Sequence, residues 1–315
     1  MSDFFDCIDT IFVIEEGKIK DKGEDSYGLK VSEESAYAAV FDGSGGMGSK
    51  IYPEFDNHTG AYVASRLVSK SFSRWYEDYH DYHFSTSDEM IDSISSYFKA
   101  DYRNTSQNVG GNSRIGGSMV RDFPTTAAIA LINYFDNSVY LNSIWAGDSR
   151  VYIINDEGLA QVTIDDVENK DAFMNLREDG AMTNVLASDG RFDLHLKSMV
   201  IDRPTMVFSA TDGCFGYISS PMEFEYTFLE ILAGSSSINE FMDNMKNFYR
   251  DVSGDDFALA FMAFHYGSFG AMRDSVKKRL DYLKKNYIEP IEKNRNDEFI
   301  GEMWKKYKPQ YERLC

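Results

Sequence analysis

The side chains that could do chemistry in this sequence are aspartates at the ends of apolar runs. Asp42 and Asp212 each directly follow such a run, in AYAAVF-DG and MVFSAT-DG. Asp255 begins the acidic pair in front of a third run, FALAF, while Asp148 follows SVYLNSIWAG and Asp25 precedes SYGLKV. Carboxylates buried at strand ends are costly when unpaired, because desolvation and mutual repulsion disfavour the charged state. A cluster of their oxygen atoms around Mg²⁺ or Mn²⁺ would remove this cost.

Asp-Gly is also a common turn sequence, so these aspartates have a second interpretation as turn or cap residues. The chain contains four Asp-Gly pairs, which begin at positions 42, 179, 189 and 212. Asp179-Gly180 and Asp189-Gly190 lie in polar stretches, and we expect ordinary turns there. Spacing alone does not show that the other aspartates converge, so the metal and turn interpretations both stay open at this point.

The elements that would position these carboxylates are mostly short strands, interrupted by two helices over the first 265 residues. We expect strands at Thr10–Glu15, Ala36–Phe41, Ala127–Tyr134, Ser138–Ile144, Arg150–Ile154, Thr205–Ala210 and Phe257–Phe264. Their near-continuous apolar runs indicate strands buried on both faces, and Asp136-Asn137 indicates a hairpin. Helices are expected at His58–Trp75 and at Ser87–Tyr102, with Ser87 as the N-cap of the second. This order predicts antiparallel sheets covered by helices rather than a βαβ alternation.

The end of the chain differs in composition from the rest. Asn104–Pro124 is a polar, glycine-rich connection, whereas from about Gly267 the sequence is rich in Lys, Glu, Arg and Tyr. One helical stripe ends near Pro290, and Asn296 opens a final helix. The stripes are formed by Val276, Leu280, Leu283 and Tyr287, and then by Phe299, Met303 and Tyr307. We therefore expect a main domain at residues 1–266 and a C-terminal helical extension at residues 267–315.

The overall charge excludes some classes of partner. Against 32 Lys and Arg stand 51 Asp and Glu, a formal net charge of -19, which repels nucleic acid and anionic membranes. Cys7, Cys214 and Cys315 are odd in number and widely spaced, so neither a disulfide framework nor a zinc site is indicated. The acidic N-terminus does not resemble a secretory signal, and no apolar run approaches the roughly 20 residues of a membrane span. We expect a reduced, cytoplasmic protein.

Six sequence blocks occur in the order found in one enzyme family. They are KIKDKGEDS (18–26), VFDGSGG (40–46), TTA (125–127), WAGDSRVY (145–152), SATDG (209–213) and GDDFAL (254–259). Together they resemble the PP2C-type, metal-dependent serine/threonine protein phosphatases, in particular bacterial members, over about residues 10–265. The resemblance implies an α+β fold, a four-layer αββα sandwich of two antiparallel sheets flanked by helices. It places metals between the sheets at one end.

The resemblance also implies a metal site built from the same aspartates. Asp42 resembles the carboxylate that bridges two Mn²⁺ or Mg²⁺ ions, and Gly43 resembles the residue that offers a backbone carbonyl to one of them. Asp212 and Asp255 resemble the terminal ligands. Asp148, in the GDS block, resembles the ligand of a third, weaker ion in bacterial members.

The implied reaction is hydrolysis of phosphoserine and phosphothreonine in proteins by direct attack of a metal-bridging hydroxide. Asp25 resembles the carboxylate that orders metal-bound waters, and Asp25, Asp42 and Lys20 are the expected catalytic residues. Lys20 stands where the family usually has a phosphate-gripping arginine, and lysine lacks the bidentate fork of arginine. The implied partners are a phosphorylated protein substrate and a cognate serine/threonine kinase or its targets.

A second hypothesis, from a different class, is a pseudophosphatase: the same fold kept as a phosphoprotein-binding regulatory module. Lys20 supports it, as do Ser44, where many eukaryotic members have histidine, and the unusual FPTT block at 123–126. The complete set of expected metal ligands favours the enzyme. If histidine is the usual general acid, the enzyme would use metal-bound water instead.

The stretch Thr163–Leu186 resembles the mobile flap of the family and the element that follows it. Val167 departs from the family, because many members have a histidine after the acidic pair. The polar composition of the stretch by itself would predict a surface helix and loop.

Other motifs fit sites less well. Residues 43–48 match G-x-G-x-x-G, but the next helix is expected only at about His58, which argues against a dinucleotide site. Residues 111–118 approximate a phosphate-binding loop without its essential lysine. His80 and His83 are expected on a solvated surface, and Cys214 is expected to be a buried, inert thiol.

Overall fold

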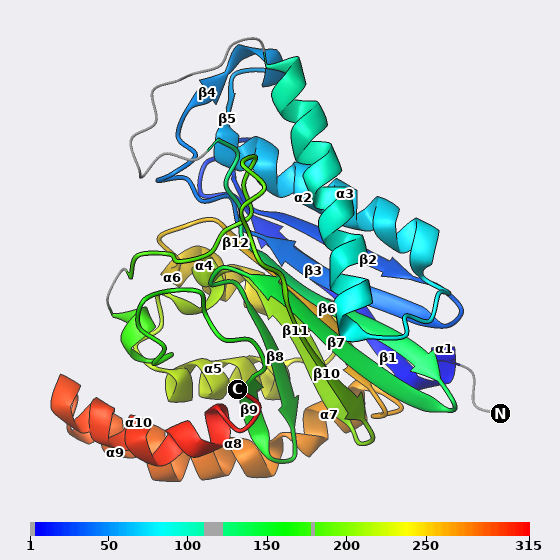
Figure 1. The fold of residues 1–315 in the computed structure, drawn as a ribbon. Coiled ribbons are helices and arrows are strands. Elements are labelled where there is room, and N and C mark those ends of the chain that lie inside the picture. Colours follow the sequence, from blue (N-terminus) through cyan, green and yellow to red (C-terminus); the bar gives the residue numbers. More distant parts are fainter. Residues whose placement is uncertain (1–3, 110–121, 178–179) are drawn as a thin grey trace.

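Two five-stranded antiparallel sheets form the centre of the computed structural model, which describes residues 4–109, 122–177 and 180–315 (Figure 1). The first sheet has the order β1 (Ile8–Glu16), β12 (Phe257–Phe264), β11 (Thr205–Ala210), β8 (Arg150–Asn155) and β9 (Gly158–Gln161). The second has the order β10 (His195–Ile201), β7 (Ser138–Ala146), β6 (Ala127–Phe135), β3 (Ser35–Phe41) and β2 (Ser26–Val31). All seven strands expected from the apolar runs are present, and the predicted α+β sandwich is confirmed.

The two sheets pack face to face through small side chains. Along β3, Tyr37 and Phe41 belong to the core under the helices. Ala36 and Ala38, which alternate with them, belong to the core between the sheets. The Ser209 hydroxyl of β11 donates a hydrogen bond to the Ala38 carbonyl oxygen of β3, at 3.0 Å. Because both faces of β3 are buried, its sequence is a continuous apolar run rather than an alternation.

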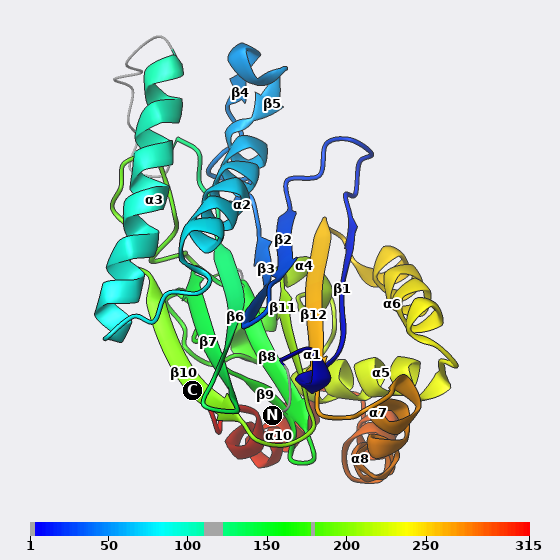
Figure 2. The same cartoon turned by 90° about the vertical axis from the view of Figure 1, so that its right-hand side faces the viewer.

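Helices cover the outer face of each sheet, as Figures 1 and 2 show. On the β3 sheet lie α2 (Gly60–Tyr79) and α3 (Ser87–Asn108), and on the β12 sheet lie α5 (Pro221–Gly234) and α6 (Ile238–Val252). The tail comprises α7 (Phe269–Ser275), α8 (Lys277–Leu283), a π-helical turn (Lys284–Ile288), α9 (Glu289–Lys293) and α10 (Asp297–Tyr311), and it packs against α5 and β9. Shorter elements are α1 (Phe4–Cys7), β4 (Ile51–Tyr52), β5 (His58–Thr59), α4 (Asp212–Phe215) and 3-10 turns at Pro53–Phe55 and Met174–Leu176. Within the described residues, no helix is long and apolar enough to span a membrane.

The sequence predicts only two helices before residue 265, so α5 and α6 correct that expectation. α5 packs against both the sheet and the tail helices, and its apolar residues therefore do not form a single stripe. α6 does carry buried Phe241, Met245 and Tyr249 at four-residue spacing, a signal that the sequence analysis overlooked. Each helix begins with a serine N-cap, Ser220 or Ser237.

The start of each predicted helix also shifts slightly. The N-cap of α3 is Thr86 rather than Ser87, because the Thr86 hydroxyl accepts the Glu89 amide N–H at 3.1 Å. α2 starts at Gly60 rather than at His58, because His58 pairs with β4 as part of β5.

Two expectations for the second half of the chain are wrong. Pro290 does not end the tail helix, because it lies in the first turn of α9, where a missing amide N–H is tolerated. The π-helical turn that precedes it keeps the chain helical. In its described residues, Thr163–Leu186 contains one short 3-10 turn instead of a surface helix, and buried Phe173 and Leu186 anchor it to the core.

The close packing of the sheets predicts a size limit at Ala38. Replacing Ala38 by Leu should lower the free energy of unfolding by about 1–3 kcal/mol, because the added atoms must displace the facing sheet. Urea denaturation measures the change. Val31→Leu, at a 39% exposed position of β2, is the control and should stay within about 0.5 kcal/mol. Equal stability of both variants would contradict the packing.

Candidate metal centre and active site

Thr125 and Thr126 hold the backbone of Asp42 where it leaves β3. The Thr126 amide and the Thr125 hydroxyl both donate to the Asp42 carbonyl oxygen, at 2.8 Å and 2.7 Å. The Asp42 amide in turn donates to the Thr126 hydroxyl at 3.4 Å. The TTA block therefore fixes the strand end that carries Asp42.

The glycines that follow the two strand-end aspartates are required by close packing, not by a turn. A Cβ on Gly43 would lie 2.5 Å from a backbone carbonyl oxygen of α2. A Cβ on Gly213 would lie 1.8 Å from the carbonyl oxygen just before β12. Gly190, in contrast, has a φ of +68°, as expected for an ordinary turn. The structure thus separates the pairs at 42 and 212 from the turn at 189, while Asp179 lies outside the described residues.

Thr211 connects Asp25 to the other sheet. Its hydroxyl donates to Asp25 Oδ2 at 2.7 Å and accepts the Ala258 amide N–H at 2.9 Å. Asp25 precedes β2 of the second sheet, whereas Thr211 and Ala258 belong to neighbouring strand ends of the first. Asp25 is only 5% exposed, so this contact holds its carboxyl group at the junction of the two sheets.

The five aspartates identified in the sequence act on one another electrostatically. Burial raises the pKa of Asp42 well above its usual value, and the charges of all four other aspartates raise it further. Burial and the charge of Asp212 raise the pKa of Asp148 to about 7. Burial and the charge of Asp255 raise the pKa of Asp212 to about 6, and burial raises the pKa of Asp25 well above its usual value. The other four aspartates therefore lie within electrostatic reach of Asp42.

This cluster offers carboxylate oxygens to a cation. Asp148 Oδ1 is buried, and no described residue donates a hydrogen bond to it. The neighbouring Arg150 guanidinium is committed to Asp165, at 2.9 Å and 2.6 Å. Oxygen ligands of this kind suit Mg²⁺ or Mn²⁺, so the residue types fit the implied ions. Across the described ranges, however, no three acidic, imidazole or thiol side chains are arranged to enclose one ion.

Comparison with known proteins was made for both sequence and fold. No family model and no curated protein sequence matches the chain. The Mycobacterium tuberculosis serine/threonine phosphatase PstP/Ppp has a TM-score of 0.57 and 17% identity, over 81% of this chain and 98% of that one. Serine/threonine phosphatase Stp1 from Staphylococcus aureus has a TM-score of 0.57 and 17% identity, over 81% and 94%. The PstP catalytic domain in complex with 2 manganese ions has a TM-score of 0.53 and 16% identity, over 82% and 99%.

The chain has the PP2C-type phosphatase fold. The six sequence blocks lie at the ends of strands and in the loops beside them.

Asp255 and Asp256, in front of β12 of this PP2C-type fold, have different environments. Asp255 is exposed, and its Oδ1 accepts the Asp256 amide N–H at 2.8 Å. Asp256 accepts the amides of Lys18 and Glu24, at 2.5 Å and 2.6 Å, and so closes the loop between β1 and β2. Lys20 lies exposed in this loop, and in the described part of the chain no contact joins it to the five aspartates. The role of Asp256 was not predicted, although the acidic pair is visible in the sequence, and the role of Lys20 stays a prediction.

A cavity of about 350 Å³ lies beside the aspartates, three of which line it. Its other side is formed by part of the stretch Thr163–Leu186, including Val167 and Arg177. Val167 is buried at the position where the family often has histidine. Arg177 lines the cavity, and its guanidinium pairs with Asp297 at 2.9 Å.

The remaining sequence predictions concern single residues. Cys214 is buried as predicted, and burial raises the pKa of its thiol well above the usual value, whereas the inertness of the thiol stays a prediction. His80 and His83 lie at the surface as expected, and the Ser44 hydroxyl is buried with no hydrogen-bond partner among the described residues. Residues 111–118 lie outside the described part.

The raised pKa values of Asp148 and Asp212 predict how stability depends on pH and on divalent ions. The folded protein keeps protons that the unfolded chain releases near pH 4, so without metal the cluster lowers the free energy of unfolding as pH rises from about 4 to about 7. Bound Mn²⁺ compensates the ionised carboxylates and should therefore raise the melting temperature more at pH 8 than at pH 5. At a concentration of about 100 Kd the gain is about 2.7 kcal/mol, or roughly 4 °C for a chain of 315 residues.

Differential scanning fluorimetry with EDTA or Mn²⁺ measures this shift. Asp42→Asn should remove most of the response to Mn²⁺, whereas Asp189→Asn, at the turn pair, should leave it unchanged. An equal Mn²⁺ shift at both pH values would contradict the electrostatic argument.

Proposed function

We propose that this chain is a metal-dependent protein phosphatase that hydrolyses phosphoserine and phosphothreonine. The observation that carries the proposal is the set of five aspartates that converge on Asp42 at one end of a PP2C-type sandwich. The fold alone supports phosphatase chemistry only by analogy, because the three structures named above are 16–17% identical. The cluster adds support from the residues of this chain.

The residues that would hold Mn²⁺ or Mg²⁺ are those at the centre of the cluster. Asp42 and the Gly43 carbonyl, with Asp212 and Asp255, would hold two ions, and Asp148 would contribute to a third. When bound, such ions supply Lewis-acid activation of water and offset the negative charge of the phosphoryl group. Asp255 is exposed at the rim, so its side chain can turn toward a cation without leaving a buried position.

Asp25 is suited to hold a proton or to orient water beside the phosphoryl group. Thr211 donates to Oδ2 and leaves Oδ1 of the same carboxyl group for water. Because burial raises the pKa of Asp25, this group can take up a proton at neutral pH more readily than an exposed aspartate. The β1–β2 loop, closed by Asp256, presents Lys20 as the expected cation for the phosphate.

The thiol next to the cluster supports direct hydrolysis rather than a phosphocysteine route. Cys214 follows the Asp212-Gly213 pair, but its raised pKa disfavours the nucleophilic thiolate. We propose a reduced, cytoplasmic setting, because the three cysteines of the sequence are too few and too widely spaced for a disulfide framework. We propose a phosphorylated protein as the substrate. The implied partners also include a cognate serine/threonine kinase or its targets.

A pseudophosphatase is the second candidate, and two observations favour it. Asp255 lies at the exposed rim, and Lys20 makes no contact with the cluster within the described residues. Such a protein would bind phosphoproteins without turning them over.

The deciding experiment measures turnover of p-nitrophenyl phosphate and of a phosphothreonine peptide. We expect hydrolysis with Mn²⁺ and none with EDTA. In Asp212→Asn we expect kcat to fall at least about 100-fold, because removing a metal ligand should cost more activity than removing a group that only contacts a ligand. Asp189→Asn is the matched control, since it changes the same residue type in another Asp-Gly pair. Turnover without metal would exclude the proposed mechanism, and tight phosphopeptide binding without turnover would favour the pseudophosphatase.

A further inference from the structure

Residues 165–177, which we call the wall segment, line the cavity beside the aspartates. Asp165, Val167, Asn175 and Arg177 of this segment contribute to the lining. Its regular structure is one 3-10 turn, Met174–Leu176. The conformation of the wall segment therefore depends on contacts with other parts of the chain.

The C-terminal helix α10 contacts the wall segment directly at two places, and at a third place it contacts a residue that holds the segment. At the start of the helix, Asp297 pairs with Arg177 at 2.9 Å. In its middle, Trp304 and Lys308 both donate to Asp171, at 3.1 Å and 2.6 Å. At its end, the Tyr311 hydroxyl lies 3.4 Å from Arg150, which holds Asp165. The helix therefore contacts the wall segment directly at Arg177 and Asp171, and it reaches Asp165 only through Arg150.

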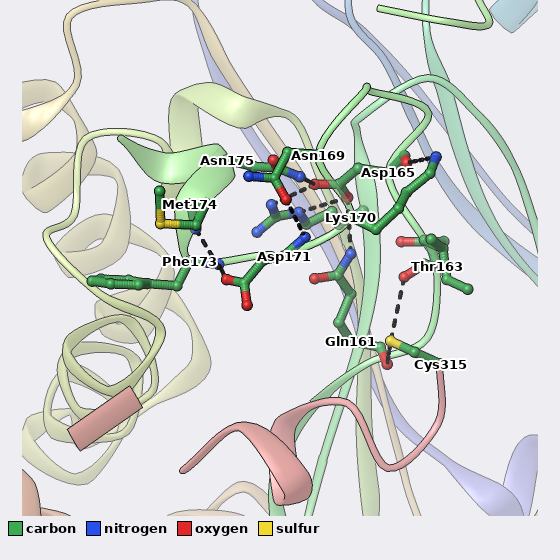
Figure 3. A network of polar contacts seen from close by, with 12 residues as sticks. Gln161, Thr163, Asp165, Asn169, Lys170, Asp171, Phe173, Met174, Asn175 and Cys315 are labelled. Carbon is green, nitrogen blue, oxygen red and sulfur yellow. Dashed lines mark hydrogen bonds and ion pairs between the residues drawn. The ribbon is translucent and has the colours of Figure 1, made fainter. Parts of the chain in front are cut away.

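The middle contact controls the local fold of the wall segment. Asp171 Oδ1 accepts the amides of Phe173 and Met174, at 3.0 Å and 3.1 Å, and so caps the 3-10 turn (Figure 3). Burial alone would raise the pKa of Asp171, but the hydrogen bonds from Lys308 and Trp304 outweigh it and hold the pKa below its usual value. The carboxylate that shapes the turn is therefore kept charged and oriented by α10.

The contact at the end of α10 is buried, and its arginine also touches the short helix that begins at Asp212. Asp165 accepts from Arg150, Gln161 and Asn175, so its carboxylate is satisfied from three sides (Figure 3). The Arg150 guanidinium lies 4.2 Å from the ring centre of Phe215 in α4, the helix that begins at Asp212. One buried arginine thus touches α10, the wall segment and the helix of a proposed ligand.

We propose that α10 positions the wall of the substrate cavity through the contacts of Trp304 and Lys308 with Asp171, and so sets the affinity for the peptide part of a phosphoprotein. This inference rests on the proposed phosphatase function. PstP/Ppp is matched over 98% of its length but covers only 81% of this chain, so part of this chain is additional to the shared fold. The helical extension expected at residues 267–315 is the part to which we assign this role.

The experiment uses the full chain with Asp171→Ala and Lys308→Met. For the phosphothreonine peptide we expect KM to rise about 10-fold in Asp171→Ala and about 3-fold in Lys308→Met, because the wall segment loses its fixed conformation. For p-nitrophenyl phosphate, which is too small to reach far along the wall, kcat and KM should stay within about twofold. Lys308→Arg should retain the ion pair and restore the peptide KM.

Lys305→Met is the matched control, because Lys305 is an exposed lysine of the same helix. Hydrogen–deuterium exchange gives a second readout that needs no activity: residues 165–177 should exchange at least about 5-fold faster in Asp171→Ala, with α2 unchanged. Unchanged peptide KM and exchange would overturn the inference, as would equal losses with both substrates. If the wild type hydrolyses neither substrate, the phosphatase proposal fails, and peptide affinity together with exchange still tests the role of α10.

Discussion

Asp42, Asp148 and Asp212 are partly buried ionisable groups at one end of two packed sheets, where burial and the charges of neighbouring aspartates raise the pKa of each above its usual value. Such an arrangement lowers stability unless protons or cations balance it. The surrounding structure is organised around this constraint. Thr125, Thr126 and Thr211 donate hydrogen bonds that keep the carboxylates and their strand ends in place. A divalent cation would turn the same repulsion into binding energy.

Close approach of the backbone is what makes the cluster possible. The chain around Gly43 lies against α2, and the chain around Gly213 lies against the residues before β12, at distances that leave no room for a Cβ atom. Small residues such as Ala38 let the two sheets approach in the same way. Carboxylates from both sheets can therefore meet at one end of the sandwich. The pairing of small residues with strand-end aspartates links the packing of the core to the chemistry proposed for the site.

The C-terminal helix adds a second level of organisation around the same centre. It contacts the wall segment at Asp171 and Arg177, and it contacts Arg150 beneath the cluster. These contacts are ionic or charge-assisted. The Arg150–Asp165 pair is buried, so removing either side chain of the pair would leave the charge of the other uncompensated. The helix therefore supports the residues that line the cavity, although no residue of it contacts the aspartates in the described structure.

The sequence by itself determined seven of the strands and the main candidate residues, because a strand buried on both faces must be apolar throughout and an aspartate at its end is conspicuous. It did not predict β10, whose residues are mostly half-buried or exposed and form no apolar run. It left open whether Asp-Gly at 42 and 212 is a turn, and only the tertiary contacts of Gly43 and Gly213 decided this. It gave no sign of the roles of Asp256 or Asp171, whose partners Lys18 and Lys308 lie 238 and 137 residues away. Periodicity and propensity report on neighbours along the chain. Contacts that close over such separations depend on how the sheets and helices pack, and only the tertiary structure decided them.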